Sequence, residues 1–262
     1  MQRSMTRLYF MDSMRSILMM LGVVLHSVNV FDTKKDWIIY SEHTTIVADY
    51  ISSFIHLFRM PAFFVISGYF CAFTLIRYKP KKFLIIRLRR LLIPLIVTIV
   101  TLNTIQTVIL SHSGFHKFEL SDYLLNGKWI SHLWFLINLI LYFLLAALIS
   151  FLTPRFVVKM KPSFDHFLLA CPIVLIIISL PILTFIILSL TKIGFPLYSR
   201  YFGLINMYQL CIYLPYFIFG AVLASNSELL HRFSKINPYF IIPTLIISIF
   251  LNNIFLSGDS IQ

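Results

Sequence analysis

Long apolar blocks, separated by short polar connectors, run through almost the whole chain. Each block has about the length, roughly 20 residues, that a helix needs to cross the hydrocarbon core of a bilayer. Backbone groups in hydrocarbon must be hydrogen-bonded within their own segment, so blocks of this length are predicted to be helices. The predicted spans are residues 14–31, 49–76, 91–111, 130–152, 166–190, 206–225 and 238–256. The pattern therefore predicts an all-α integral membrane protein, a multi-pass bundle of about seven transmembrane helices.

The composition agrees with a membrane protein and excludes an ordinary soluble fold. The 262 residues are 59% hydrophobic and 12% charged, whereas soluble domains are about half apolar and a quarter charged. No connector is long enough, or rich enough in Gly and Ser, to act as a flexible linker, so residues 1–262 are interpreted as a single transmembrane domain. Kinks are expected at the prolines within the predicted spans, which are Pro61, Pro172, Pro181 and Pro215.

The basic residues are distributed as in a membrane protein. The formal net charge is +12, and most of the 22 Lys and Arg residues lie at the N-terminus and in the connectors 77–90, 155–161 and 232–235. These segments share one side of the predicted membrane, which the positive-inside rule makes cytoplasmic. The N-terminus is therefore predicted to be cytoplasmic. Nucleic-acid binding and a metal site are not indicated, and the three cysteines show no C-x-x-C spacing.

The first predicted span contains two candidate catalytic side chains, Arg15 and His26. They are about three helical turns apart and share one stripe of the helix at different depths. Asp12 lies about one turn before Arg15 and is expected to pair with it near the cytoplasmic surface. A neutral imidazole at His26 would accept a proton from a sugar hydroxyl as a general base. The alternative is a buried histidine that hydrogen-bonds a neighbouring helix, and the residues by themselves do not decide between the two.

The second predicted span carries two further candidate binding residues, His56 and Arg59. Their i, i+3 spacing places both on one helix face, immediately before Pro61. An arginine inside a membrane is costly and needs a carboxylate, backbone carbonyls or an anionic ligand. Because no acidic residue lies in the middle of a span, the pattern favours a ligand-facing Arg59 over a purely structural one. Further along the span, Ser67 and Gly68 are expected to permit close helix packing.

Another basic group precedes the third predicted span and contains Arg87 and Arg90. The two arginines share one face at the cytoplasmic end of the helix. One interpretation is that they only obey the positive-inside rule or bind anionic lipid headgroups. The other is that the two guanidinium groups bind the phosphates of a nucleotide-like donor such as coenzyme A.

Several of these stretches resemble the acyltransferase 3 family of membrane proteins. The matching segments, in the order of the family, are LYFMDSMRSILMMLGVVLHS, FIHLFRMPAFFVISGYF, RYKPKKFLIIRLRRLLIP, ISHLWFL and YLPYFIFGA. They extend from the first predicted span to the sixth. The R-x10-H signature of the family falls on Arg15 and His26, and its R-x-x-R pattern falls on Arg87 and Arg90.

The resemblance implies a bacterial inner-membrane O-acyltransferase. Cytoplasmic acyl-CoA would donate an acyl group, most closely succinyl, to hydroxyls of a periplasmic glucan. His26 would act as base or as transient acyl carrier, while the arginines would hold the anionic groups of the donor. The resemblance implies no bound cofactor, because acyl-CoA is a co-substrate. The implied partners are the lipid bilayer, the glucan acceptor and proteins of glucan synthesis.

Two other functions remain open from the sequence. A transporter or flippase of an anionic lipid or glycan would use His56 and Arg59 to bind its cargo without making an ester. Alternatively, the chain is an inactive relative or a partner subunit. Family members commonly continue with further spans after the seventh, and the chain is expected to lack them.

Overall fold

The chain folds as a set of helices in the computed structural model, which describes residues 9–35, 37–113, 123, 127–153, 166, 168–194, 200–201, 204–237, 239, 242 and 246. Two-residue strands form one short antiparallel pair in which Arg200 is opposite Asn206. The elements are α1 (Tyr9–Val28), η1 (Asn29–Phe31), α2 (Ile46–Arg77), α3 (Pro80–Thr98), η2 (Ile99–Asn103), α4 (Thr104–His112), η3 (Lys128–Leu133), α6 (Trp134–Leu152), α9 (Ile173–Lys192), β1 (Arg200–Tyr201), β2 (Ile205–Asn206), α10 (Met207–Ser225) and α11 (Ser227–Ser234). The helical fold predicted from the apolar blocks is therefore confirmed.

Five helices within the described residues are long and apolar enough to cross a membrane. They cover Phe10–Phe31, Ile46–Arg77, Trp134–Leu152, Ile173–Leu190 and Met207–Ser225. Large apolar side chains remain exposed along them, as expected for helices that have lipid as their solvent. These helices coincide with five of the predicted spans.

The other two predicted spans have different outcomes. Residues 91–111 lie in a helical stretch that runs without a break through α3, η2 and α4, and η2 is a π-helical turn. The side chain of Asn103 is buried at this turn, and its Nδ2 donates a hydrogen bond to the Trp129 carbonyl oxygen at 2.7 Å. Of residues 238–256, only Tyr239, Ile242 and Ile246 are described, so the seventh span lies outside the described residues as a whole.

Pro172 does not kink a helix, which corrects the prediction for residues 166–190. The helix α9 begins at Ile173, directly after Pro172, whose carbonyl oxygen accepts a hydrogen bond from the Leu175 amide at 3.0 Å. Proline lacks an amide hydrogen, and the first turn of a helix leaves amides without helical partners, so proline suits a helix start. Pro61, Pro181 and Pro215 do lie inside helices, in α2, α9 and α10.

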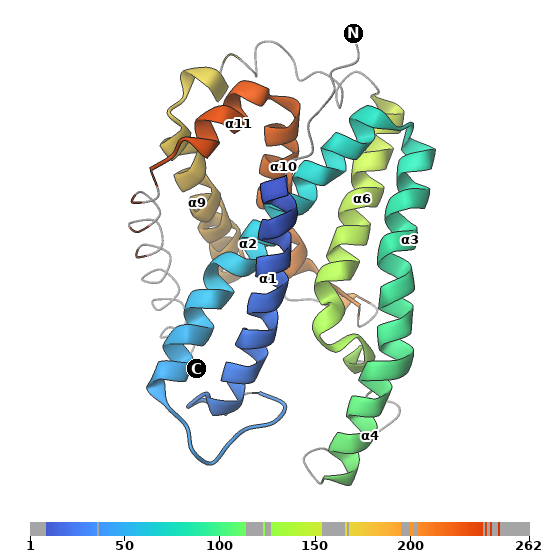
Figure 1. Cartoon of the computed structure of the whole chain (residues 1–262), viewed down its shortest axis with the longest axis vertical. Coiled ribbons are helices and arrows are strands. Elements are labelled where there is room, and N and C mark those ends of the chain that lie inside the picture. The colour runs from blue at the N-terminus through green and yellow to red at the C-terminus, as the bar shows by residue number, and fades with distance from the viewer. Residues whose placement is uncertain are drawn as a thin grey trace. The chain divides into compact units, whose positions relative to one another are not determined.

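The described residues up to Ile66, with the few after Ile236, belong to one compact unit, and Ser67–Ile236 form another. In the first unit, α1 and the first part of α2 run side by side in opposite directions, joined by a loop (Figure 1). The buried residues Met11, Leu18 and Leu25 recur at heptad spacing along α1 and define its inner stripe. Single domain organisation over 1–262 remains a prediction.

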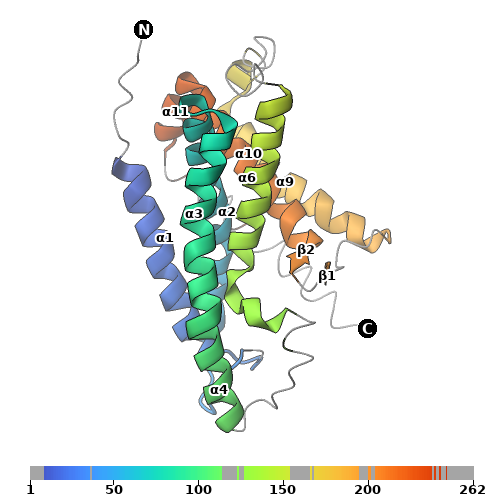
Figure 2. The same cartoon turned by 90° about the vertical axis from the view of Figure 1, so that its right-hand side faces the viewer.

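In the second unit, α3 packs against α6 and α6 against α10 (Figure 2). The fully buried Phe83 ring meets Phe143 edge to face at 5.8 Å, and the Tyr142 hydroxyl donates to the Leu210 carbonyl oxygen at 2.6 Å. At Gly68, a Cβ would lie 1.9 Å from the Phe217 carbonyl oxygen, so only glycine allows this close approach of α2 to α10. The close packing predicted at Gly68 is therefore confirmed.

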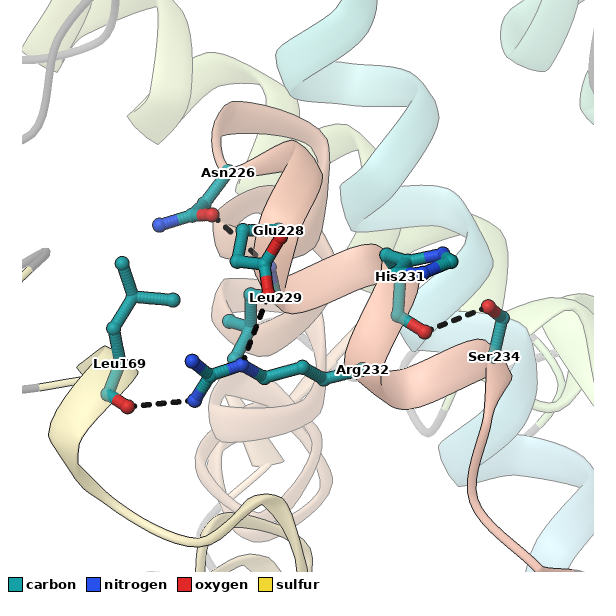
Figure 3. A network of polar contacts seen from close by, with 7 residues as sticks. All are labelled: Leu169, Asn226, Glu228, Leu229, His231, Arg232 and Ser234. Carbon is teal, nitrogen blue, oxygen red and sulfur yellow. Dashed lines mark hydrogen bonds and ion pairs between the residues drawn. The ribbon is translucent and has the colours of Figure 1, made fainter.

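The short helix α11 is fastened by polar contacts to the residues that precede α9 (Figure 3). Its N-cap, Asn226, accepts a hydrogen bond from the Leu229 amide at 3.0 Å. Arg232 pairs with Glu228 at 3.2 Å and also donates to the Leu169 carbonyl oxygen at 2.6 Å. This arginine therefore has a structural role, because its guanidinium satisfies a carbonyl group near a helix end.

Candidate functional site

His26 lies in the last turn of α1 and is covered by an aromatic ring from the following loop. Its imidazole is half-buried and stacks on the indole of Trp37, with ring centroids 5.1 Å apart and an interplanar angle of 19°. Stacking on a large aromatic surface restricts rotation of the imidazole and shields one of its faces. The histidine is therefore held in a defined orientation at the end of the helix.

The loop that carries Trp37 is tied to the two elements that flank it, η1 and α2. The Ser41 amide donates to the Val30 carbonyl oxygen at 2.8 Å, and both the amide and hydroxyl of Thr33 donate to the Asp49 carboxylate at 3.0 and 2.5 Å. Burial and the neighbouring Asp49 carboxyl group raise the pKa of Asp32 above its ordinary value. These contacts return the loop onto α1, which brings Trp37 over the imidazole.

Arg59 on α2 reaches α1 at Gly22. A Cβ atom built on the buried Gly22 would lie 2.4 Å from Arg59 Nη1 and 3.6 Å from Cζ. The guanidinium thus occupies the space that a side chain at position 22 would fill. Gly22 comes about one helical turn before His26, so the cation lies against the same segment of α1 that carries the histidine.

The remaining candidates of the first unit are more open. Arg15 is exposed about three turns before His26, and Asp12 is half-buried. Within the described residues no ion pair joins these two side chains, so the predicted pairing is not found there. The His56 side chain is exposed, whereas Arg59 is half-buried. The structure therefore brings Arg59, and not Arg15 or His56, to the segment of His26.

In the second unit, Arg87 and Arg90 have different surroundings although they were predicted as a pair. The Arg87 guanidinium donates to the Phe70 carbonyl oxygen and to the Thr74 hydroxyl, and its Cζ lies 5.5 Å from the centre of the Phe143 ring. Arg87 thus links α2, α3 and α6. Arg90 is exposed. Of the two, Arg90 has the open guanidinium that an anionic donor requires.

Two residues of this site, Gly22 and Trp37, are not among those predicted from the sequence. Gly22 could have been noticed because it precedes His26 by one helical turn and so shares its face. No spacing rule could have indicated Trp37, since its contact with His26 depends on how the loop folds back.

Comparison with protein families identifies the family of the chain. The model of a family described as an acyltransferase domain, acyltransferase 3, matches residues 8–259. The chain belongs to the acyltransferase 3 family. The resemblance found from the first predicted span to the sixth is therefore confirmed at the level of the family.

Relatives of the chain include proteins named glucans biosynthesis protein C. The protein from Salmonella gallinarum is 29% identical over 247 residues, which are 87% of this chain and 61% of the relative. The one from Salmonella paratyphi B is 30% identical over the same shares. That from Escherichia coli O6:K15:H31 is 36% identical over 141 residues, or 51% of this chain and 36% of the relative.

The chain spans only about 61% of the length of the first of these relatives. No solved structure matches the chain. The family is thus established by sequence, while substrate and activity are matters for proposal.

Proposed function

We propose that the protein is an inner-membrane O-acyltransferase that moves a succinyl group from cytoplasmic succinyl-CoA to hydroxyls of a periplasmic glucan. One observation carries the proposal: in a member of the acyltransferase 3 family, α1 presents an oriented histidine with an arginine against the preceding turn. The name of the relatives supports a glucan as acceptor. Succinyl as the acyl group comes from the family resemblance.

In this reaction His26 acts as the general base. Its neutral imidazole takes the proton of the attacking sugar hydroxyl, which makes the oxygen a better nucleophile toward the thioester carbonyl. Stacking on Trp37 restrains the imidazole and so lowers the entropy lost on reaching the reactive geometry. Acyl-CoA enters only as co-substrate, and the chemistry requires no bound cofactor.

The donor is bound at the cytoplasmic side. We assign the phosphates of succinyl-CoA to Arg90, which is exposed on α3. Arg15, exposed on α1, stays a proposed catalytic residue, and Asp12 stays a proposed donor-binding residue of the same helix. Arg87 orders the helices around the donor through its bonds to Phe70 and Thr74. His56, exposed on α2 three residues before Arg59, stays a proposed donor-binding residue.

This assignment requires the topology predicted from the positive-inside rule. Seven spans with a cytoplasmic N-terminus put the end of α1, and hence His26, toward the periplasm. Proteins of glucan synthesis are the proposed partners, since they supply the acceptor. The charge distribution of the connectors supports this orientation.

The test is transfer of label from radiolabelled succinyl-CoA to periplasmic glucan in membranes that carry the full chain. His26→Ala is expected to lower the rate by about 10²- to 10⁴-fold, the usual contribution of a general base. His112→Ala is the matched control, because His112 is exposed on α4 and is expected to keep the rate of the parent protein.

The outcomes separate the candidate functions. Label on the glucan that disappears in His26→Ala supports the proposal, and equal label in both variants rejects His26 as the base. Glucan or lipid that crosses the membrane unmodified, without consumption of succinyl-CoA, would establish a transporter instead.

A further inference from the structure

The guanidinium of Arg59 fills the place of a missing side chain on α1. The two distances from a Cβ at Gly22, 2.4 Å to Nη1 and 3.6 Å to Cζ, show that the end of the arginine, and not its aliphatic stem, lies there. Gly22 itself is buried. Any larger residue at this position would displace the charged group from α1.

His26 lies about one helical turn after Gly22 on the same face of α1. The Cα–Cβ bonds of an α-helix tilt toward its N-terminus, so a side chain covers the turn that precedes its own Cα. The turn before His26 contains Gly22, where the guanidinium lies. The Arg59 guanidinium thus lies against the turn of α1 that precedes His26, and Trp37 stacks on one face of the imidazole.

We propose that Arg59 is the oxyanion-stabilising group for acyl transfer at His26, and that Gly22 is the positioning residue that admits it. The inference rests on the acyltransferase function proposed above and assigns a distinct step to each residue. A cation held at the reacting carbonyl stabilises negative charge that develops only in the transition state. A low-dielectric surrounding in the membrane strengthens that effect.

The hydroxyl oxygen of the sugar bonds to the thioester carbonyl carbon while its proton passes to the imidazole of His26. The carbonyl π electrons move to the carbonyl oxygen, and the Arg59 guanidinium holds the resulting negative charge. When the carbonyl forms again the C–S bond breaks, and the coenzyme A thiolate leaves with the proton from His26. The products are the sugar ester and the thiol.

A glycine in a membrane helix can also serve helix packing without any part in chemistry. The two roles differ in their dependence on Arg59. If Gly22 only lets α2 approach, shortening the side chain at position 59 will not relieve the effect of Gly22→Ala. If Gly22 admits the guanidinium, a shorter cation will relieve the overlap.

The experiment compares Gly22→Ala, Arg59→Lys and the double variant in succinyl transfer from succinyl-CoA. Gly22→Ala is expected to lower kcat about 10²-fold, the typical effect of losing one oxyanion donor, with the KM for succinyl-CoA within about twofold. The double variant is expected to equal Arg59→Lys, because lysine is shorter and avoids the added methyl group. Ser27→Ala, at an exposed position of α1, is the control and keeps the parental kcat.

Folding is followed separately, by thermal unfolding of each variant in detergent. Alanine is a better helix former than glycine, so a loss of kcat in a folded Gly22→Ala protein reflects the site. Should Gly22→Ala not fold, Arg59→Gln decides, since it removes the charge without enlarging position 22. That variant is expected to lose about 10²-fold in kcat at nearly constant KM.

Three results would overturn the inference: a parental kcat in Gly22→Ala, losses that multiply in the double variant, or a rise in KM alone for Arg59→Gln. The parent protein is assayed first. No transfer by the parent rejects the acyltransferase function and the inference with it, whereas transfer by the parent followed by any of the three results rejects the inference only.

Discussion

The stacked pair of Trp37 and His26 concentrates the proposed chemistry in two side chains. The indole covers one face of the imidazole at 5.1 Å, so the ring can approach a hydroxyl only with its remaining edge and face. An aromatic pair of this kind contributes about 0.5–1.5 kcal/mol beyond the area that it buries. That energy would hold the imidazole of His26, the proposed base, in one orientation.

Removal of the indole should therefore impair catalysis more than binding. Trp37→Ala is expected to lower kcat about tenfold, which corresponds to about 1.4 kcal/mol, while Trp37→Phe keeps most of the activity. Steady-state kinetics of succinyl transfer measure both. Ile39→Ala, an exposed change in the same loop, is the control. Equal kcat values for Trp37→Ala and the parent protein would contradict the role.

Single functional residues could be recognised from the sequence where placing the side chain in a membrane span costs much free energy. His26 and Arg59 stand out because titratable and charged groups are rare inside membrane spans. Their neighbours could not be recognised in this way. The role of Gly22 becomes apparent only when Arg59 is known to lie against it, and Trp37 occupies an interfacial loop in which tryptophan is ordinary.

At the scale of elements, the loop between α1 and α2 contains a close pair of acidic residues. Asp32 lies beside the Asp49 carboxyl group, which together with burial raises the pKa of Asp32. Thr33 binds Asp49 through its amide and hydroxyl. Asp32 and Asp49 thus join the residue after η1 to the first turn of α2. A negative charge on Asp32 weakens this connection, because it repels the Asp49 carboxylate.

This pair predicts a pH-dependent contribution to stability. Because the pKa of Asp32 is raised on folding, the folded state binds the proton more tightly than the unfolded state. The stabilisation that protonated Asp32 gives the folded state is fully present below the ordinary aspartate pKa of about 3.9, and it is lost as pH rises through the raised pKa of Asp32. Asp32→Asn, which is uncharged, should match the parent near pH 4 and be the more stable protein at pH 7.

Thermal unfolding in detergent at the two pH values measures the difference between Asp32→Asn and the parent protein. Asp12→Asn is the control, since it changes a carboxyl group of α1 away from the loop. A difference that is the same at both pH values would contradict the prediction.

Elements were predictable from sequence where one pattern dominates. The apolar blocks gave helices at α1, α2, α6, α9 and α10, because only a helix satisfies its backbone over such lengths in lipid. Hydropathy could not show the π-helical turn of η2, which depends on how Asn103 reaches the Trp129 carbonyl. Hydropathy also could not show that Pro172 precedes a helix and does not kink one, since the residues on both sides of it are apolar in either case.

At the scale of the whole molecule, the proposed function depends on which side of the membrane each connector lies. The basic connector between α2 and α3 is predicted to be cytoplasmic and the loop between α1 and α2 periplasmic. With this topology, Arg90, which we propose binds the donor, is predicted at the cytoplasmic side, and His26 is predicted toward the periplasmic side. A donor that reaches His26 must extend into the membrane.

Cysteine labelling in intact cells tests this orientation. In a variant whose three cysteines are replaced by alanine, a membrane-impermeant maleimide should label His43→Cys and leave Lys79→Cys unlabelled until the cells are permeabilised. Both positions are exposed, so accessibility within the protein does not limit the reaction. The reverse pattern of labelling would invert the topology and exclude a cytoplasmic donor site at Arg90.

The contact of Gly22 with Arg59 also bears on how the sequence can vary. The two positions belong to different helices, yet the atoms of one occupy the volume that the other leaves empty. A side chain gained at position 22 therefore requires a smaller or displaced residue at position 59. Natural variation should pass through paired substitutions at these positions, so their covariation would mark the family members that share this arrangement.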